Sequence, residues 1–164
     1  LHLRLLGSGT ILREARKAAE ILRKDYSVLV DVWSVTSYNE LRREALAVSR
    51  ESMLNPSKKA KLPFVTEQLS KRSGPVISTT DYMRLYSDQI REFVPDSFRV
   101  LGTDGFGRSD SREQLRHFFE VDAKFIVLAA LSELKALDLV TAKQLTDFMT
   151  ANGIDRDKAN PISH

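Results

Sequence analysis

The sequence predicts an α/β fold with three layers, in which a mostly parallel sheet of four to five strands has helices on both faces. Two observations support this class. Short apolar runs alternate along the chain with longer segments whose apolar residues fall on one helical face. The run from 27 to 35 is also apolar almost throughout, which is typical of a parallel strand covered on both faces. Strands are expected at Leu3–Leu6, Ser27–Val35, Gly74–Ser78 and Phe98–Leu101.

Capping residues and apolar periodicity place helices between and after these strands. Helix starts are expected near Thr10, at Ser37 with Glu40, near Leu62, at Asp81, at Asp110 with Glu113, at Asp122, and at Thr141 with Gln144. Pro95 should end the helix that follows Asp81. The inner face of that helix is predicted to be Tyr82, Met83, Tyr86, Ile90, Phe93 and Val94. The run Phe125–Leu131 is apolar nearly all round, so its helix should be well buried.

Residues 1–164 are expected to form a single domain, because 42% of them are hydrophobic and can supply a core. The chain starts at Leu1 and enters an apolar run at once, so we expect a piece of a longer multidomain enzyme. The sequence contains no cysteine, which excludes disulfides and thiolate metal sites. The longest apolar run is far shorter than a membrane span, and we expect a soluble protein without membrane association.

The net charge of +3 would permit nucleic-acid binding, but the basic residues are interleaved with 22 acidic ones. The densest basic cluster is Lys58, Lys59, Lys61, Lys71 and Arg72, and no nucleic-acid motif accompanies it. A solvated surface is the favoured interpretation of this cluster. A docking surface for an anionic partner is the alternative.

Functional regions of parallel sheets lie at the carboxyl ends of the strands, where three loops are expected: Gly7–Thr10, Thr79–Asp81 and Gly102–Arg112. The first has a Gly-x-Gly pattern, and Asp31 stands at the distance of a ribose-binding acid. Leu12, however, occupies the position of the third glycine, and its bulk should prevent close packing of helix on strand. The sequence therefore argues against dinucleotide binding.

Residues that could complete an active site are scarce. Two of the three histidines lie at the chain ends, and His117 is more simply explained as a packed or capping residue than as a general base. No spacing predicts a metal site, and neither the nucleophile-elbow nor the P-loop pattern occurs. Ser8 has no evident base. We therefore predict no catalytic, cofactor-binding or metal-binding residue within this chain.

The loop from Gly102 to Arg112 needs an explanation beyond turn formation, because it combines three glycines with two arginines. Its backbone amides, Arg108 and Arg112 could cradle an anion. Alternatively, ion pairs among Asp104, Arg108 and Asp110 could hold the loop to itself while Phe106 fills a neighbouring gap. Phe106 could also anchor a protein interface. Residue types alone leave these alternatives open.

The same loop carries a resemblance to a known family. Gly102–Arg112 (GTDGFGRSDSR) and Phe119–Ala123 resemble the C-terminal domain of the homodimeric type of pyruvate dehydrogenase decarboxylating component. Further similar stretches are Leu5–Gly9, Ala18–Leu22, Asp31–Ser37, Ser78–Met83 and Asn160–Pro161. The similarity extends from about Leu3 to Pro161. Transketolase itself is a poorer match, because its C-terminal domains share the Phe-Gly turn without the full loop.

The resemblance implies a transketolase-like C-terminal fold and an oxidoreductase that decarboxylates pyruvate on thiamine diphosphate and acetylates the lipoyl group of the dihydrolipoyl acyltransferase component. It also implies a bacterial cytoplasmic homodimer whose thiamine diphosphate and magnesium are bound by preceding domains that this chain lacks. The chain alone should therefore be inactive and should support dimer and domain assembly. An alternative is the equivalent domain of another thiamine-dependent enzyme of the transketolase type.

Within this resemblance, one group of residues is predicted to form a wall at the active-site entrance or an interface. These candidates are Asp104, Phe106, Arg108, Ser109, Arg112 and His117. Asp104 and Arg108 are expected to fix the loop, Phe106 to pack across a domain boundary, and Arg112 to offer positive charge. Two other hypotheses remain. The domain could be an interaction module that uses the Lys58–Arg72 surface to contact the acyltransferase or a regulator, or a stand-alone anion-binding domain.

Overall fold

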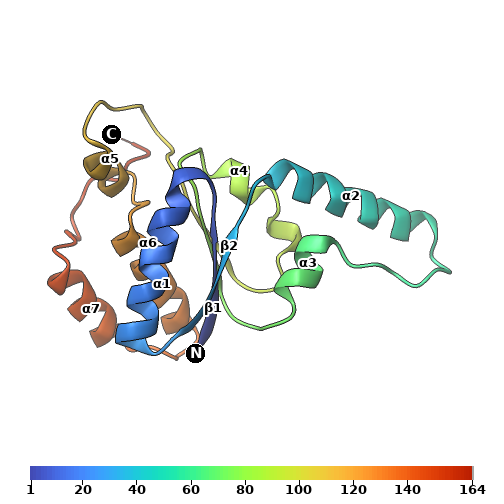
Figure 1. Ribbon diagram of the computed structural model, residues 1–164, viewed down its shortest axis with the longest axis horizontal. Coiled ribbons are helices and arrows are strands. Elements are labelled where there is room, and N and C mark those ends of the chain that lie inside the picture. The colour runs from blue at the N-terminus through green and yellow to red at the C-terminus, as the bar shows by residue number, and fades with distance from the viewer. Residues whose placement is uncertain (164) are drawn as a thin grey trace.

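The computed structural model describes residues 1–163 and shows an α/β fold built on a sheet of four parallel strands (Figure 1). The strands lie in the order β2-β1-β3-β4, and they are β1 (His2–Gly7), β2 (Leu29–Ser34), β3 (Val76–Thr79) and β4 (Phe98–Leu101). In register, Gly7 faces Ser34 and Thr79, and Thr79 faces Leu101. All four strands therefore end at one edge, called here the carboxyl edge. The predicted fold class is confirmed, with four strands.

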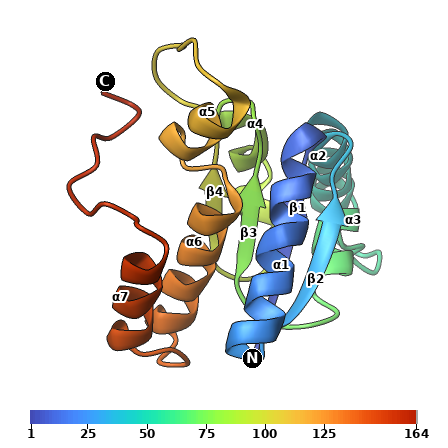
Figure 2. The same ribbon diagram turned by 60° about the vertical axis from the view of Figure 1, so that its left-hand side comes forward.

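Helices cover both faces of the sheet (Figure 2). α1 and α6 pack on one face with α7 beyond them, while α2, α3 and α4 lie on the other. Their bounds are α1 (Leu12–Tyr26), α2 (Tyr38–Leu54), α3 (Phe64–Leu69), α4 (Leu85–Asp88), α5 (Arg112–Phe118), α6 (Ala123–Ala136) and α7 (Ala142–Ala151), with single 3₁₀ turns at η1 (Gly9–Ile11) and η2 (Arg91–Phe93). Within residues 1–163, no helix has the length and apolar character needed to cross a membrane.

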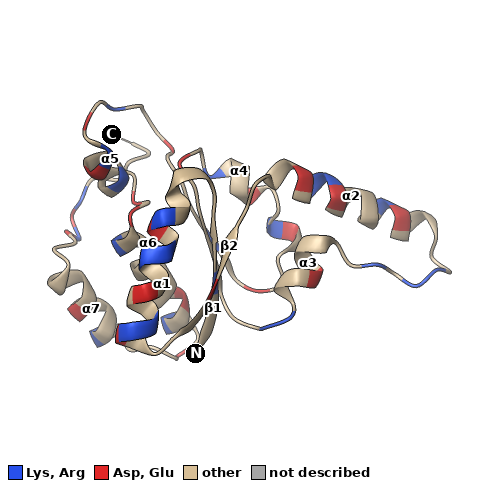
Figure 3. Ribbon diagram, in the orientation of Figure 1, with Lys and Arg blue, Asp and Glu red and all other residues tan. Residues whose placement is uncertain are grey.

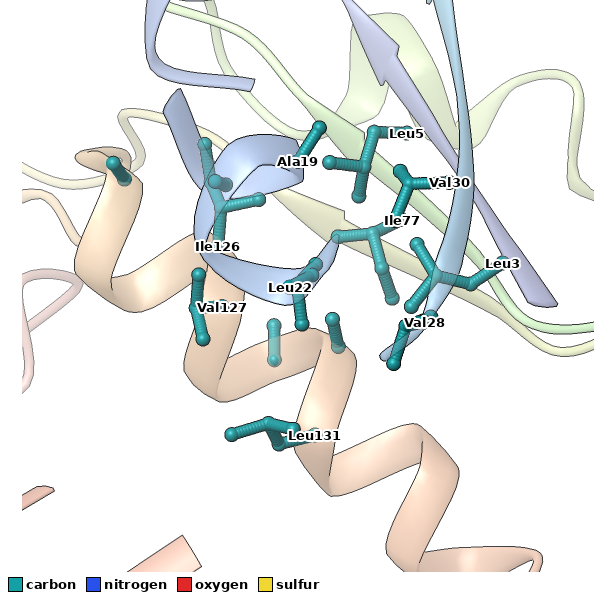
Figure 4. Packing of buried hydrophobic residues seen from close by; sticks show 14 of the residues in the cluster. Leu3, Leu5, Ala19, Leu22, Val28, Val30, Ile77, Ile126, Val127 and Leu131 are labelled. Carbon is teal, nitrogen blue, oxygen red and sulfur yellow. The ribbon is translucent and has the colours of Figure 1, made fainter. Parts of the chain in front are cut away.

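The larger core lies between the sheet, α1 and α6 (Figure 4). Strand residues such as Leu5 and Ile77 meet Leu22 of α1 and Ile126 of α6, and all four are fully buried. Alanines on the inner face of α1 let that helix approach the strands closely. The prediction that the apolar run of α6 is well buried is confirmed, since most of its side chains are buried.

The second core, on the opposite face, is smaller. Leu6, Val76 and Ile90 lie at its centre. α2 contributes only Tyr38 and Ala45 as buried residues, and the rest of this helix extends away from the sheet (Figure 1). The far part of α2 is therefore held mainly by its own helical hydrogen bonds.

The predicted caps are partly confirmed. Asp122 accepts a hydrogen bond from the amide of Phe125, and Thr141 forms a complete capping box with Gln144. Ser37 caps α2 as predicted, but the carboxylate of its box partner Glu40 binds Arg43 instead. The prediction that Asp110 caps the next helix is wrong. Ser111 caps α5 by accepting from the amide of Gln114, while Asp110 binds the amide of Ser111.

The predicted continuous helix after Asp81 is also wrong, since α4 and the η2 turn replace it. Backbone groups of this segment bond to the loop after β4: the Tyr82 carbonyl accepts from the amide of Thr103, and Asp104 accepts from the amide of Arg84. The Tyr82 carbonyl is thus used by Thr103 instead of by a helical turn, whereas the Arg84 amide would have no intrahelical partner at a helix start. Ile90 and Phe93 are buried as predicted and Val94 is half-buried, whereas Tyr82, Met83 and Tyr86 are exposed.

A buried chain of hydroxyl groups connects α2, β3 and α4. The Tyr38 hydroxyl lies 2.6 Å from the Ser78 hydroxyl, which donates to Ser87 at 2.8 Å. Burial raises the pKa of Tyr38 above its ordinary value of 10.0, and the hydrogen bonds with the two serines act in the opposite direction.

The raised pKa predicts a loss of stability in alkali. Because the unfolded phenol ionises near its ordinary pKa while the folded one keeps its proton, the free energy of unfolding should fall as the pH rises above about 10. Tyr38→Phe should cost about 1 kcal/mol at pH 7 and make this alkaline fall shallower. Urea unfolding at several pH values up to about 11 measures both effects. If the free energy of unfolding falls with pH equally steeply in the wild type and in Tyr38→Phe, Tyr38 is not the group responsible for the alkaline loss of stability.

Candidate functional site at the carboxyl edge

The three loops predicted at the carboxyl edge are in contact with one another. The Ser8 hydroxyl donates to Thr80 at 2.8 Å, and the Thr10 hydroxyl donates to the carboxylate of Asp81 at 3.2 Å. The Thr103 hydroxyl donates to the Asp81 carbonyl at 2.8 Å. The segment around Asp81 thus joins the loop after β1 to the loop after β4.

Close packing at Gly7 corrects one prediction from the sequence. A Cβ on Gly7 would lie 2.8 Å from the Cα of Leu12, so the first turn after β1 lies directly against the strand. The expectation that Leu12 prevents this approach is wrong. Asp31 faces Arg4 in register, well before the carboxyl edge, and its carboxylate binds His2 at 3.0 Å and Arg72 at 3.4 Å. Asp31, which the sequence pattern compared with a ribose-binding acid, therefore forms ion pairs away from the carboxyl edge.

The loop after β4 is fixed mainly by backbone contacts. A Cβ on Gly102 would lie 2.7 Å from the Tyr82 carbonyl oxygen, so this approach requires glycine. Asp104 accepts from the Arg84 amide at 2.9 Å and lies 3.6 Å from the Arg84 guanidinium. Asp104 thus binds Arg84 instead of Arg108, and the ion pairs expected among Asp104, Arg108 and Asp110 do not form among residues 1–163.

Arg108 and Lys158 both contact the ring of Phe118. The Arg108 guanidinium carbon lies 3.9 Å from the ring centroid and the Lys158 ammonium 5.2 Å from it, both within the range of cation–π interactions. Lys158 also donates to the Phe118 carbonyl at 2.7 Å and to Glu120 at 3.2 Å. Phe118 therefore connects the loop to the segment that follows α7.

That C-terminal segment runs back to the loop (Figure 2). Gly105 has a φ of +102°, and a Cβ there would lie 2.1 Å from the Pro161 carbonyl oxygen. Pro161 is itself buried. The backbones of loop and C-terminal segment are thus too close for any side chain at position 105.

Phe106 projects from the loop between two glycines and is 76% exposed. It does not fill a gap among residues 1–163, so that alternative is wrong. Ser109 is also exposed and lines a shallow hollow of about 480 Å³ together with Arg108, His117 and Lys158. The structure therefore brings Arg108, Ser109 and His117 together, while Phe106 is left without a partner side chain among the described residues.

His117 is packed against α6. Its Nδ1 lies 3.1 Å from the Asp122 carboxylate, and its ring lies 5.3 Å from that of Phe125. This arrangement agrees with the packed role preferred from the sequence. His2 binds Asp31 near the opposite end of the sheet, and His164 lies outside the described residues.

A cavity of about 370 Å³ opens beside the loop. Its lining residues come from all three carboxyl-edge loops and from α5: Thr10, Ile11, Asp81, Thr103, Gly105, Phe106, Gly107, Arg108, Arg112, Leu115, Arg116, Phe119 and Val121. Sequence reasoning missed Arg116 and the buried Glu14 that holds it at 3.1 Å. These two residues are 102 positions apart, and no local pattern in the sequence connects them.

The residues at this edge offer hydroxyl groups and positive charge. The Ser8 hydroxyl donates to Thr80, and no basic side chain among the described residues accepts a hydrogen bond from it. No group of three or more His, Asp or Glu side chains within residues 1–163 has the arrangement of a metal site. Three arginines in the cavity lining are suited to an anionic group.

The chain is similar to known proteins over nearly its whole length. A family model described as the transketolase-like TK C-terminal domain matches residues 1–122. Pyruvate dehydrogenase E1 components are 54% identical over 162 residues in Pseudomonas aeruginosa, 51% over 158 in Escherichia coli K12, and 45% over 162 in Cupriavidus necator. The matches cover 96–99% of this chain but only 18% of each relative.

The contact between loop and C-terminal segment can be tested at two glycines. Gly105→Ala should lower the free energy of unfolding by about 1–3 kcal/mol and make the C-terminal segment more accessible, because the methyl group is strained and meets the Pro161 carbonyl. Gly107→Ala is the matched control, since nothing lies within 4 Å of its added Cβ. Chemical unfolding and limited proteolysis measure the two changes. Equal stability of both variants would contradict the contact.

Proposed function

The chain belongs to the family of transketolase-like C-terminal domains, and we propose that it is the C-terminal domain of a pyruvate dehydrogenase E1 component. The observation that carries this proposal is the identity of 45–54% to such components over nearly all of the chain. The complete enzyme would decarboxylate pyruvate and transfer the acetyl group to the lipoyl group of the acyltransferase component. It would work as a homodimer in the bacterial cytoplasm.

Thiamine diphosphate and magnesium would be bound outside these 164 residues. Magnesium prefers oxygen ligands, usually carboxylates together with phosphate oxygens. The cavity at the carboxyl edge offers one carboxylate, that of Asp81, beside three arginines. This cavity therefore does not fit a magnesium–diphosphate group, and no group of three or more His, Asp or Glu side chains within residues 1–163 could hold the metal.

The role proposed for this domain is to complete a wall of the active-site entrance and to support assembly. Phe106 is largely exposed on a loop that is otherwise tightly fixed by Gly102, Asp104 and Gly105. A rigid loop that presents one aromatic side chain is a suitable anchor for a neighbouring domain. Since the relatives are more than five times longer than the match, such a neighbour would lie in the same enzyme.

Removal of the Phe106 side chain tests this role in the complete enzyme. Phe106→Ala should weaken dimer or domain assembly and lower pyruvate turnover about tenfold, because buried aromatic anchors dominate interface energies. Leu137→Ala is a control, since Leu137 is 53% exposed in the turn after α6. Sedimentation velocity, thermal unfolding and turnover are the measurements. If Phe106→Ala has the same assembly state, thermal unfolding midpoint and pyruvate turnover as the control variant, the anchor role is wrong.

A second candidate function is that of an interaction module for the acyltransferase or a regulator. It is favoured by the segment between α2 and α3, where Lys58, Lys59 and Lys61 are all exposed (Figure 3). None of the three forms an ion pair among the described residues, whereas Arg72 is paired with Asp31. Such a surface suits an acidic partner.

Charge reversal separates the two candidate functions. Lys58→Glu with Lys59→Glu should abolish most binding to the acyltransferase component if the module exists, and leave turnover with an artificial electron acceptor unchanged. Arg13→Glu with Arg16→Glu, on the exposed side of α1, makes the same change of charge elsewhere. Pull-down assembly and turnover are measured for both. If the two double variants bind the acyltransferase component equally well, the surface around Lys58 and Lys59 is not its docking site.

A further inference from the structure

We propose that the arginine-lined cavity at the carboxyl edge binds a small organic anion, consisting of a phosphate or carboxylate group on a short apolar body. The proposal goes beyond the function proposed above and does not depend on it. It rests on the charge of the cavity lining, on a buried carboxylate that orients one arginine, and on an apolar floor.

The cavity lining carries an excess of positive charge. Arg108, Arg112 and Arg116 line it with one carboxylate, that of Asp81, and Glu14 pairs with Arg116 from behind the lining, so three positive charges meet two negative ones. The Asp81 side chain accepts a hydrogen bond from Thr10 at 3.2 Å and forms no ion pair with any of the three arginines among the described residues. Guanidinium groups bind carboxylates and phosphates through paired, charge-assisted hydrogen bonds. The lining therefore favours an anion.

Arg116 is held in place from behind. Its guanidinium donates to buried Glu14 at 3.1 Å and to the Thr10 hydroxyl at 3.3 Å. Glu14 also accepts from the Ala123 amide at 3.2 Å and lies 3.1 Å from Lys17, so its charge is shared among several donors. A guanidinium fixed in this way loses little freedom when it binds a ligand.

Arg112 is the arginine of the cavity lining whose charge is not paired within the described residues. It is exposed, and it forms no hydrogen bond or ion pair with any other described residue. Arg112 and Arg116 stand four residues apart on α5, so their side chains share one face of that helix. Arg108 approaches the same cavity from the loop. Together they place three guanidinium groups around the opening: Arg116 held by Glu14, Arg108 stacked on Phe118, and Arg112 without a bonded partner among the described residues.

The inner part of the cavity is apolar. Ile11, Phe119 and Val121 form a small buried cluster there, with Leu115 packed against it. The volume of about 370 Å³ lies near the lower end of the roughly 300–1,000 Å³ that is usual for small-molecule sites. The cavity therefore has a positively charged side and an apolar side. It suits a compact ligand whose anionic group lies toward the arginines and whose apolar part lies toward Ile11.

Titration calorimetry of the 164-residue chain with phenyl phosphate tests the proposal, and inorganic phosphate and benzoate serve as comparison ligands. Phenyl phosphate should bind with a Kd of about 1 mM or lower, and more tightly than inorganic phosphate because of its ring. If benzoate binds about as tightly as phenyl phosphate, the site recognises either anionic group. If benzoate does not bind, the ligands of this site are limited to phosphates. Absence of heat with phenyl phosphate up to about 10 mM would overturn the proposal.

Variants then locate the binding site. Arg112→Gln should weaken phenyl phosphate binding about tenfold, and Arg112→Lys less, because lysine keeps the charge without the paired hydrogen bonds. Arg50→Gln, on the exposed surface of α2, removes the same charge far from the cavity and should have no effect. Equal weakening by Arg112→Gln and Arg50→Gln would refute the site. Unchanged circular dichroism confirms that each variant is folded, and none of these measurements depends on thiamine-dependent turnover.

Discussion

The buried carboxylate of Glu14 is the interaction on which the geometry of the carboxyl edge depends. It binds Arg116 and the Ala123 amide, which lie 102 and 109 residues later in the chain. A buried carboxylate is strongly destabilising unless it is paired and hydrogen-bonded, so α5 and the start of α6 must dock on α1 together. The loop between β4 and α5 is consequently held at both ends, by the sheet and by Glu14.

Glycines determine how the middle of that loop is held. Gly102 lies against the Tyr82 carbonyl and Gly105 against the Pro161 carbonyl, at distances that exclude a side chain. Because the fixing contacts are largely made by backbone atoms, most side chains of the loop remain exposed, Phe106 and Arg112 among them. Their exposure on a rigid support is what makes them suitable for contacts with molecules or domains beyond this chain.

The sequence predicted the features that depend on local patterns. The strands, the burial of α6 and the caps at Asp122 and Thr141 follow from apolar runs or from bonds between residues three positions apart. Some errors are local, such as the helix cap assigned to Asp110 that the neighbouring Ser111 makes instead, and others concern side chains whose partners are distant. Asp81 binds Thr10, 71 residues away, and Asp104 binds Arg84 rather than Arg108. Such choices depend on the order of strands in the sheet, which no local pattern specifies.

The polar groups of the carboxyl edge are engaged in structural contacts. This explains why the sequence pointed to a family by resemblance but did not point to a mechanism. Ser8 is engaged by Thr80, Glu14 by Arg116, and Asp81 by Thr10, so each candidate nucleophile or base among these residues already serves the structure. Reactive groups in enzymes generally have a partner that raises their reactivity instead. What remains free is positive charge and one aromatic ring. Charge and ring can recruit and orient another molecule, which is the role proposed for this domain.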